Sequence, residues 1–513
     1  MIVEVKHILI GLIIVLIVYV VYLEVLKSNN DINQIYLQEQ SNQDSTRLFH
    51  ESPIYKSNKL DYGGGLRIGL DIRYDHYKIR HGNLNDIWSI VMNGVEKKGG
   101  NRKGITINDS FKSFRKLNYQ VNKFQQFLIK HDIKSLKINQ RLFLKSFDLF
   151  VIIISSFINQ TIIEFYDNYK ILEDDKGWIV IDDEEKSLID HPNYININDQ
   201  TIFNINDNNE SSDFPYEYNP SKDKGVCFKL IGKTLSGNPN MISTVEFTQL
   251  NIISAIASSL KHLPPGHELS SKDSILVVQS STNKFSSLMN EMVKILMGLT
   301  SNAKVYIHND DEFKWDQSMA KIDPTILSIN SKQLSSVNSF KSKLNSLQPI
   351  IHKHNLKSLE QGRFPSHQLE KLHPGNLRII YLSESITSPP QFSFADLNEL
   401  RSILSTRIIY EFNTYNVSSA IIHTDMFDYR DFKVKCKSWG CLSQSLEIKL
   451  INVDEMSKIG DVMIRGFIIG KTMNKFSTNN INEDNGKSSS GDGFMPLVNV
   501  RGKWGNDGCL YIV

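Results

Sequence analysis

Cysteine is scarce in this chain. The 513 residues include four cysteines, and only Cys436 and Cys441 lie close together in the sequence. A single Cys-x4-Cys pair, without a second pair or a nearby histidine, is a weak zinc motif, so we expect no metal site. Cysteines this widely spaced give no disulfide framework and indicate reduced thiols in a domain that faces the cytosol.

An excess of charge of either sign is also missing. The 58 basic and 56 acidic side chains leave a net charge of +2. Nucleic-acid-binding proteins concentrate Lys and Arg on one surface, so the composition argues against a nucleic acid as partner. The length predicts two or more subdomains, and 40% hydrophobic residues suffice for their cores.

A small-residue cleavage site is missing after the first apolar run. Residues 8–23 are apolar without interruption, and the residues that follow are bulky. A secretory signal peptide would end in a small-residue site, so we interpret residues 1–28 as an uncleaved transmembrane anchor. A short span suits a thin bilayer. We therefore expect a single-pass protein of the endoplasmic reticulum membrane with its domain in the cytosol.

The segment after this anchor is polar, and the remainder is globular. Residues 29–59 are rich in Asn, Gln and Ser, and are predicted to form a solvated tether. Residues 60–513 are predicted to form one large α/β domain. In it, residues 60–375 supply the first and second subdomain sheets, and residues 376–513 a C-terminal part with a β-hairpin subdomain.

Three stretches of the globular part carry specific expectations. The apolar run 150–157 is placed as a buried strand only by the resemblance described next, and the Asp- and Asn-rich residues 170–222 are interpreted as an elaborated loop. In the last third, the alternating segments 447–450 and 460–466 flank an acidic turn at 452–458, which predicts a β-hairpin. Helices and strands alternate before it, as a doubly wound sheet requires.

The order of these segments resembles the adenylate-forming (AMP-binding) superfamily, and within it the long-chain acyl-CoA synthetases. The resemblance is carried by Tyr415-Asn416-Val417-Ser418-Ser419, Trp439-Gly440-Cys441, Glu447-Ile448-Lys449-Leu450, Gly460-Asp461-Val462-Met463-Ile464-Arg465-Gly466 and Asp492-Gly493-Phe494. It implies the large N-terminal domain of that fold, with two doubly wound sheets and a small distorted β-barrel. It also implies that the family's C-terminal lid domain, with its catalytic lysine, is absent.

Residues 233–240 resemble the family's phosphate loop. Glycines in such a loop let backbone N–H groups approach phosphate oxygens, and hydroxyls and a lysine add donors. In this sequence Leu235 replaces a hydroxyl and Asn240 replaces the lysine, so the resemblance implies weakened ATP binding. An ordinary turn is the alternative interpretation. The degenerate nucleotide contacts that the resemblance implies here are Lys233, Thr234, Ser236, Gly237 and Pro239.

Three later residues complete the implied nucleotide site. By the resemblance, Tyr415 would stack on the base and Ser418 would touch phosphate, whereas Asn499 replaces the carboxylate that binds ribose. Ser419 replaces the glutamate that holds magnesium, and a neutral hydroxyl is a poor ligand for that ion. The turn at 382–385, which the family makes with glycines against the base, contains no glycine here. Tyr415 also fits a simple core or strand-end aromatic.

Three functional hypotheses follow. The first is a membrane-anchored acyl-CoA synthetase-like pseudoenzyme without catalytic residues, which has a binding or regulatory role in lipid metabolism and binds fatty acid or acyl-CoA. The second is an active long-chain fatty acid–CoA ligase, which would use ATP and Mg²⁺. The third is a scaffold that recruits active acyl-CoA synthetases to the membrane.

Overall fold

The structure is a computed structural model of the chain. It describes residues 2–25, 29–32, 34–44, 48–60, 65–73, 76–97, 103–169, 177–186, 191–198, 209–216, 218–232, 241–280, 285–309, 313–336, 348–365, 375–431, 436–476, 482–483 and 493–513.

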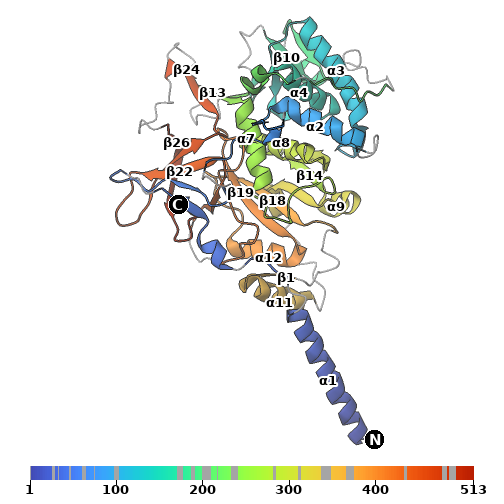
Figure 1. Ribbon diagram of the computed structural model, residues 1–513, viewed down its shortest axis with the longest axis vertical. Coiled ribbons are helices and arrows are strands. Elements are labelled where there is room, and N and C mark those ends of the chain that lie inside the picture. The colour runs from blue at the N-terminus through green and yellow to red at the C-terminus, as the bar shows by residue number, and fades with distance from the viewer. Residues whose placement is uncertain are drawn as a thin grey trace.

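Helix α1 (Ile2–Val25) extends away from the rest of the protein (Figure 1). The large apolar side chains between Leu9 and Val21 are all exposed. Among the residues that the structure describes, no helix has both the length and the apolarity that crossing a membrane requires. The anchor predicted for residues 1–28 is therefore without support from the structure.

Residues 29–59 differ from the predicted solvated tether, because they pair with the folded domain. Strand β1 (Asn29–Asn30) pairs with β17 (Arg363–Phe364), and β2 (Ser41–Gln43) pairs with β3 (Tyr55–Ser57), which continues onto β22 (Leu446–Ile451). Strands β1, β2, β3 and β17 have two or three residues each. Strands this short show no periodicity in the sequence, so only their partners define them.

The first large sheet has eight strands in the order β11-β10-β8-β9-β12-β13-β24-β25. The strands from β11 to β12 are parallel, and the remainder are antiparallel. Their bounds are β11 (Tyr194–Asn196), β10 (Trp178–Ile181), β8 (Ser135–Asn139), β9 (Ile162–Tyr166), β12 (Val226–Gly232), β13 (Met241–Thr248), β24 (Lys471–Phe476) and β25 (Asn482–Glu483).

Helices α3 (Phe114–Lys130) and α4 (Phe147–Asn159) accompany this sheet. Phe157 of α4 meets Phe228 of β12 edge to face, with ring centroids 5.3 Å apart. The structure corrects two expectations here. The run 150–157 is helical and not a strand. The sequence could not distinguish the two, because an apolar run that is buried on all sides has no periodicity of either kind. Residues 170–222 contain β10 and β11, which are only three or four residues long.

The second large sheet has fifteen strands in the order β2-β3-β22-β23-β26-β27-β21-β20-β19-β18-β16-β14-β15-β6-β7. Strands β19, β18, β16, β14, β15 and β6 are parallel, and antiparallel strands continue the sheet on both sides. The remaining bounds are β23 (Gly460–Gly466), β26 (Met495–Trp504), β27 (Leu510–Ile512), β21 (Ser438–Leu442), β20 (Ile422–His423), β19 (Arg407–Asn413), β18 (Ile379–Ser385), β16 (Ile326–Asn330), β14 (Ser274–Gln279), β15 (Lys304–Asn309), β6 (Gly104–Ile107) and β7 (Ser110–Ser113).

The predicted hairpin is confirmed as β22 and β23, which pair antiparallel from Leu446↔Gly466 to Ile451↔Asp461. The mixed α/β class is also confirmed. The parallel pairing of β16 with β18 joins strands on the two sides of residue 375.

Helices lie on both sides of the parallel strands (Figure 1). On one side, between the two large sheets, are α2 (Leu84–Lys97), α7 (Gln249–Lys261) and α8 (Phe285–Thr300); on the other are α12 (Phe394–Leu404) and, outside it, α11 (Gln348–Glu360). Residues 287–299 of α8 are all buried. This helix is therefore the centre of the core, and the polar groups it carries must find partners inside the protein.

Candidate functional site

The whole predicted phosphate loop, residues 233–240, lies outside the described residues. This holds for Lys233, Thr234, Ser236, Gly237 and Pro239, which follow the last residue of β12. Their contribution to a nucleotide site stays a prediction.

Ser418 is buried in the loop that follows β19. Its hydroxyl lies 3.1 Å from the carbonyl oxygen of Ile468 and 3.2 Å from that of Asn251. Donation to these carbonyls joins the loop to α7 and to the segment before β24. This geometry favours a packing role for Ser418. The neighbouring Tyr415 is half-buried, and burial raises the pKa of its phenol.

Asn499 lies apart from this loop, on β26. Its side chain is exposed, its φ is +59°, and it stands where the register between β23 and β26 shifts. Asparagine is one of the few residues that tolerate a left-handed backbone. The left-handed conformation of Asn499 suits the bulge at this register shift, and its predicted ribose contact stays a prediction.

A polar pocket lies where four neighbouring parallel strands end. It follows the last residues of β14, β16, β18 and β19, the edge at which open α/β sheets bind ligands. We call it the strand-end pocket. Every lining side chain is polar, and the volume is about 40 Å³. The lining residues are Ser280, Ser286, Ser287, Asn330, Ser331, Lys332, Glu384, Ser385, Ser388 and Asn413.

Glu384 is the carboxylate of this pocket, with 4% of its surface exposed. One of its oxygens, Oε2, accepts hydrogen bonds from the Tyr410 hydroxyl and from the Gln391 backbone N–H at 3.2 Å. Burial raises the pKa of the Glu384 carboxyl, and the hydrogen bond from Tyr410 partly opposes that rise. The prediction of a turn at 382–385 is wrong, because these residues are the end of β18, paired with β16 and β19, and Glu384 lies in that strand. The resemblance places this segment against the nucleotide base.

Buried side chains fix the backbone behind the pocket. The Ser280 N–H donates to Glu291 of α8 at 3.2 Å. Gln333 donates through Nε2 to the carbonyl of Gln279 at 2.9 Å and accepts from the Asn330 N–H at 3.1 Å. The ends of β14 and β16 are therefore tied to each other and to α8, so the pocket is rigid.

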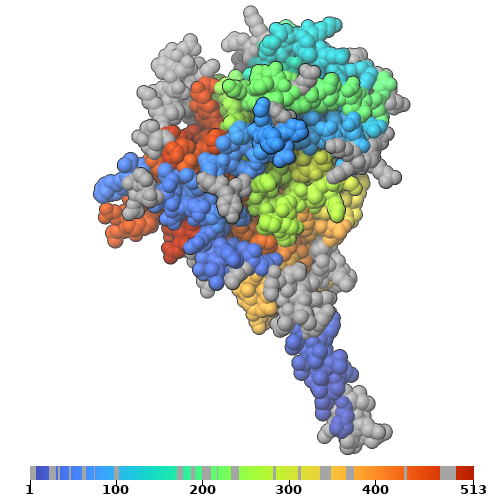
Figure 2. All heavy atoms as spheres, in the orientation of Figure 1, coloured from blue at the N-terminus to red at the C-terminus, as the bar shows by residue number. Residues whose placement is uncertain are grey.

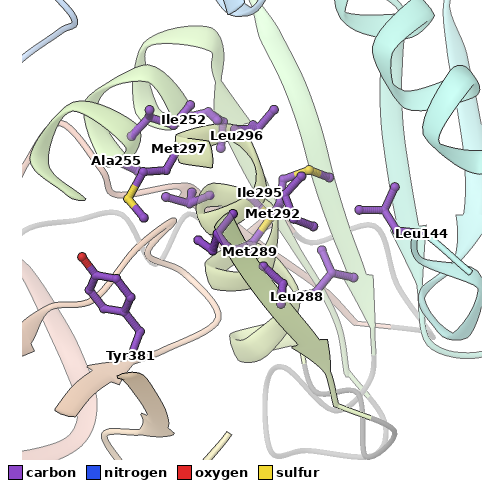
Figure 3. Packing of buried hydrophobic residues seen from close by; sticks show 14 of the residues in the cluster. Leu144, Ile252, Ala255, Leu288, Met289, Met292, Ile295, Leu296, Met297 and Tyr381 are labelled. Carbon is purple, nitrogen blue, oxygen red and sulfur yellow. The ribbon is translucent and has the colours of Figure 1, made fainter. Parts of the chain in front are cut away.

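A buried ion pair lies deeper, under the same strands. Lys294 of α8 contacts Glu411 of β19, and Asn290 donates to the other Glu411 oxygen at 3.3 Å. The Lys294 ammonium also lies 3.8 Å from the ring centroid of Tyr381, which Figure 3 shows beside side chains of α7 and α8. Burial lowers the pKa of Lys294, and Glu411 opposes that shift.

Two buried histidines, His262 and His423, extend this polar interior. Their ring centroids are 5.0 Å apart, and His262 lies 5.6 Å from the ring of Tyr381. Burial, then the nearby charge of Lys59, lowers the pKa of His423 to about 4. Burial also holds the pKa of His262 well below its ordinary value, followed by the effects of His423 and Lys294. Both imidazoles are therefore neutral at pH 7.

The chemistry open to the strand-end pocket is hydrogen bonding. Hydroxyls and amides both donate and accept, and Lys332 adds a cation. Within the described ranges, no group of three or more His, Cys, Asp or Glu side chains is arranged to hold a metal ion. Small-molecule sites usually measure roughly 300–1,000 Å³, so the pocket is too small for a nucleotide as it stands.

Sequence reasoning singled out the turn at 382–385 for its missing glycine and did not identify Glu384 as a functional residue. The other lining residues come from separate segments, and serines and asparagines are common in this chain. The one available signal was positional, because polar residues directly after four apolar strands gather at one sheet edge.

Comparison with known proteins is consistent with this architecture. No protein-family model matches the chain. It is 26% identical over 545 aligned positions to an uncharacterised protein of Saccharomyces cerevisiae, YHR045W, with 94% of each chain covered.

Among solved structures, the chain is similar to VinN, with a TM-score of 0.57, 13% identity, and 88% of this chain and 100% of that chain covered. It is also similar to o-succinylbenzoate CoA synthetase from Bacillus subtilis in complex with ATP and magnesium. That comparison has a TM-score of 0.56 and 15% identity, and covers 82% of this chain and 78% of the synthetase. The chain therefore has the fold of the adenylate-forming enzymes.

Proposed function

We propose that this protein is an acyl-CoA synthetase-like protein with impaired catalysis and a binding or regulatory role in lipid metabolism. The observation that carries the proposal is the position of Glu384. Its buried carboxylate, held by Tyr410 and Gln391, lies at the end of β18, in the segment that the resemblance assigns to the nucleotide base. A buried glutamate side chain there fills the space beside the base that a glycine leaves open.

Two further observations support the proposal. The strand-end pocket of about 40 Å³ holds only a few water-sized groups. The Ser418 hydroxyl, which the resemblance assigns to phosphate, lies against two backbone carbonyls instead. Phosphate binding depends on charge-assisted hydrogen bonds worth roughly 1.5–3 kcal/mol each, so loss of several of them weakens binding by orders of magnitude.

The exposed apolar side chains of α1 support a second part of the proposal, that the protein associates with a lipid bilayer. An exposed apolar surface gains free energy when lipid covers it. Endoplasmic reticulum membrane, with the folded domain in the cytosol, is the location we propose. Vesicle flotation tests it: the full chain should float with phosphatidylcholine vesicles, and a variant without residues 1–28 should remain at the bottom of the gradient.

The proposed impairment of catalysis is tested with the purified full chain. We expect no ATP–pyrophosphate exchange above background with long-chain fatty acids, and no ATP binding by calorimetry at millimolar ATP. The B. subtilis synthetase with o-succinylbenzoate serves as the positive control. Acyl-adenylate or acyl-CoA formation by this chain would overturn the proposal.

The alternatives predict different results in the same experiments. An active fatty acid–CoA ligase requires stoichiometric ATP binding at micromolar concentration. A scaffold for active synthetases requires co-purification with such an enzyme, unchanged by substitutions in the strand-end pocket. The proposed binding role requires saturable binding of a fatty acid or acyl-CoA to the full chain.

A further inference from the structure

Helix α11 lies at the place where α1 joins the folded domain. Shortly after α1 the chain forms β1, which pairs antiparallel with β17, and β17 begins shortly after α11 ends. Figure 1 and Figure 2 show α11, in gold, at the end of the folded domain from which the blue α1 extends. A lipid surface that covers the exposed apolar side chains of α1 therefore comes close to α11.

Buried contacts fix the residue that follows β1 to the domain. The Asp31 carboxylate lies 2.7 Å from the Arg407 guanidinium and accepts a hydrogen bond from the Tyr429 hydroxyl at 2.6 Å. The Arg407 guanidinium also lies 4.2 Å from the ring centroid of Phe364 in β17. Because 5% of the Asp31 side chain is exposed, salt screens this ion pair little. The chain that continues from α1 is therefore held beside the end of α11.

One face of α11 packs on the domain. Asn355 and Leu359 are buried, and the Asn355 amide donates to the Ser402 carbonyl of α12 at 3.3 Å. The His352 ring nitrogen Nδ1 lies 2.8 Å from the Ser402 hydroxyl oxygen. These contacts fix the rotation of α11 about its own axis and so determine which side chains it presents to solvent.

The opposite face of α11 is exposed. Ile350, Lys353 and Lys357 have the spacing of one helix face, and all three are exposed, Ile350 to 68%. Among the described residues, no ion pair or hydrogen bond engages the ammonium group of either lysine. We call these three residues the outer face of α11. Lysine lays its apolar stem along lipid while its ammonium stays at the headgroups, so this face suits the boundary of a bilayer.

The charge around the outer face is positive. The connection between β16 and β18, residues 331–378, contains α11 and has eight Lys or Arg and two Glu, a net charge of +6 in a chain whose total is +2. Glu360, one of these two, is exposed at the end of α11. A cluster of this kind attracts an anionic surface, and the attraction weakens as salt increases. The charge therefore favours an acidic ligand.

The position beside α1 decides between acidic ligands. A bilayer covers the apolar side chains of α1 and the outer face of α11 at the same time, whereas an acidic protein or a nucleic acid leaves α1 in water. We propose that the outer face of α11 binds the headgroups of anionic phospholipids in the bilayer with which α1 associates. This binding depends on the lipid association proposed for α1, and it adds a class of lipid and the residues that select it.

Vesicle flotation of the full chain, over a range of lipid concentrations, tests this binding. The vesicles are phosphatidylcholine alone or an about 2:1 mixture of phosphatidylcholine and phosphatidylserine, at about 0.05 M and about 0.5 M salt. We expect about tenfold tighter binding to the mixture at low salt and a much smaller difference at high salt. Lys353→Glu/Lys357→Glu should remove this preference and leave binding to phosphatidylcholine alone unchanged.

A matched control makes the same change of charge far from α1. Lys130 is the last residue of α3, Lys134 follows it closely, and both are exposed. Figure 1 shows α3 at the end of the domain opposite to α1. Lys130→Glu/Lys134→Glu should therefore keep the preference for phosphatidylserine.

A second measurement detects contact with lipid directly. An environment-sensitive fluorophore is attached to Ile350→Cys in a chain that also carries Cys436→Ser, because the other three native cysteines are buried. The emission should shift to shorter wavelength when the mixed vesicles are added. The same fluorophore on Ile129→Cys of α3, where the native side chain is 60% exposed, should show no shift.

The outcomes separate α11 from α1. No flotation on either kind of vesicle would refute the lipid association of α1 and the role of α11 with it. Equal affinity for both kinds, or a preference that survives Lys353→Glu/Lys357→Glu, would overturn the role of α11 alone. A preference lost equally in Lys130→Glu/Lys134→Glu would assign it to the overall charge and would also overturn that role, as would an unshifted fluorophore at position 350.

Discussion

Lys294 of α8 and Glu411 of β19 form an ion pair in the interior, with 0% and 4% of their side chains exposed. Removing two charges from water costs free energy, which is offset only when the two opposite charges contact each other. Asn290 and the ring of Tyr381 complete their environment. The pair therefore joins the central helix to the sheet directly below the strand-end pocket.

Removing one member of this pair should destabilise the protein strongly. Lys294→Met leaves the Glu411 carboxylate buried without its cation, and we expect a loss of about 3–5 kcal/mol in the free energy of unfolding. Urea denaturation followed by circular dichroism measures it. The double variant Lys294→Met/Glu411→Met should lose less than the sum of the two single variants. Additive losses would contradict coupling between the two charges.

Glu384 and Tyr410 should also be coupled. Glu384→Ala leaves the buried Tyr410 hydroxyl without its acceptor, which should cost about 1–3 kcal/mol of stability. Tyr410→Phe removes the donor instead. In the double variant the orphaned hydroxyl is gone, so Glu384→Ala should cost less when Tyr410→Phe is already present than it costs in the native chain. Thermal unfolding of the four proteins gives this coupling, and equal costs in both backgrounds would contradict the hydrogen bond.

Stability should fall as pH falls from about 6.5 towards 4. In the unfolded chain His262 and His423 take up protons near pH ~6.5. The folded protein excludes these protons because both pKa values are lowered, that of His423 to about 4. The histidine contribution is therefore complete above pH ~6.5, and each histidine removes up to about 1.4 kcal/mol per pH unit below it. Glu384, whose pKa is raised, acts in the opposite direction near its own titration.

Urea denaturation at a series of pH values between about 7.5 and 4.5 measures this pH dependence. The free energy of unfolding of His423→Gln should depend less steeply on pH than that of the native chain. The variant has one fewer imidazole that takes up a proton on unfolding. His76, which lies in the turn between β4 (Ile72–Arg73) and β5 (Ile79–Arg80) near the exposed Tyr77, is the matched control, and His76→Gln should leave the slope unchanged. An unchanged slope in His423→Gln would contradict the assignment.

Ser418 and Asn499 should behave as structural residues. Ser418→Ala removes a hydroxyl that donates to a backbone carbonyl and should cost about 0.5–1.5 kcal/mol. Asn499→Gly should be nearly neutral, whereas Asn499→Val should cost about 1–2 kcal/mol because a β-branched residue is strained at φ +59°. Thermal unfolding measures all three. A Ser418→Ala variant of native stability would contradict its packing role.

Much of the fold could be predicted from the sequence. The hairpin at 447–466 has the alternation of its structure in the sequence, and the structure has it. The helix at 147–159 could not be predicted, because an apolar run without periodicity does not distinguish helix from strand. The candidate site could be predicted only in part, because its lining residues come from segments that are far apart in the chain.

By itself the sequence determined the alternation of strands and helices and the hairpin between residues 447 and 466. Local patterning encodes these properties. Only the tertiary structure placed residues 29–59 on the sheet, buried Lys294 against Glu411 and turned the Glu384 carboxylate towards Tyr410. Those relationships depend on which distant segments share the low-dielectric interior, where each charge needs a partner, and no local pattern specifies that.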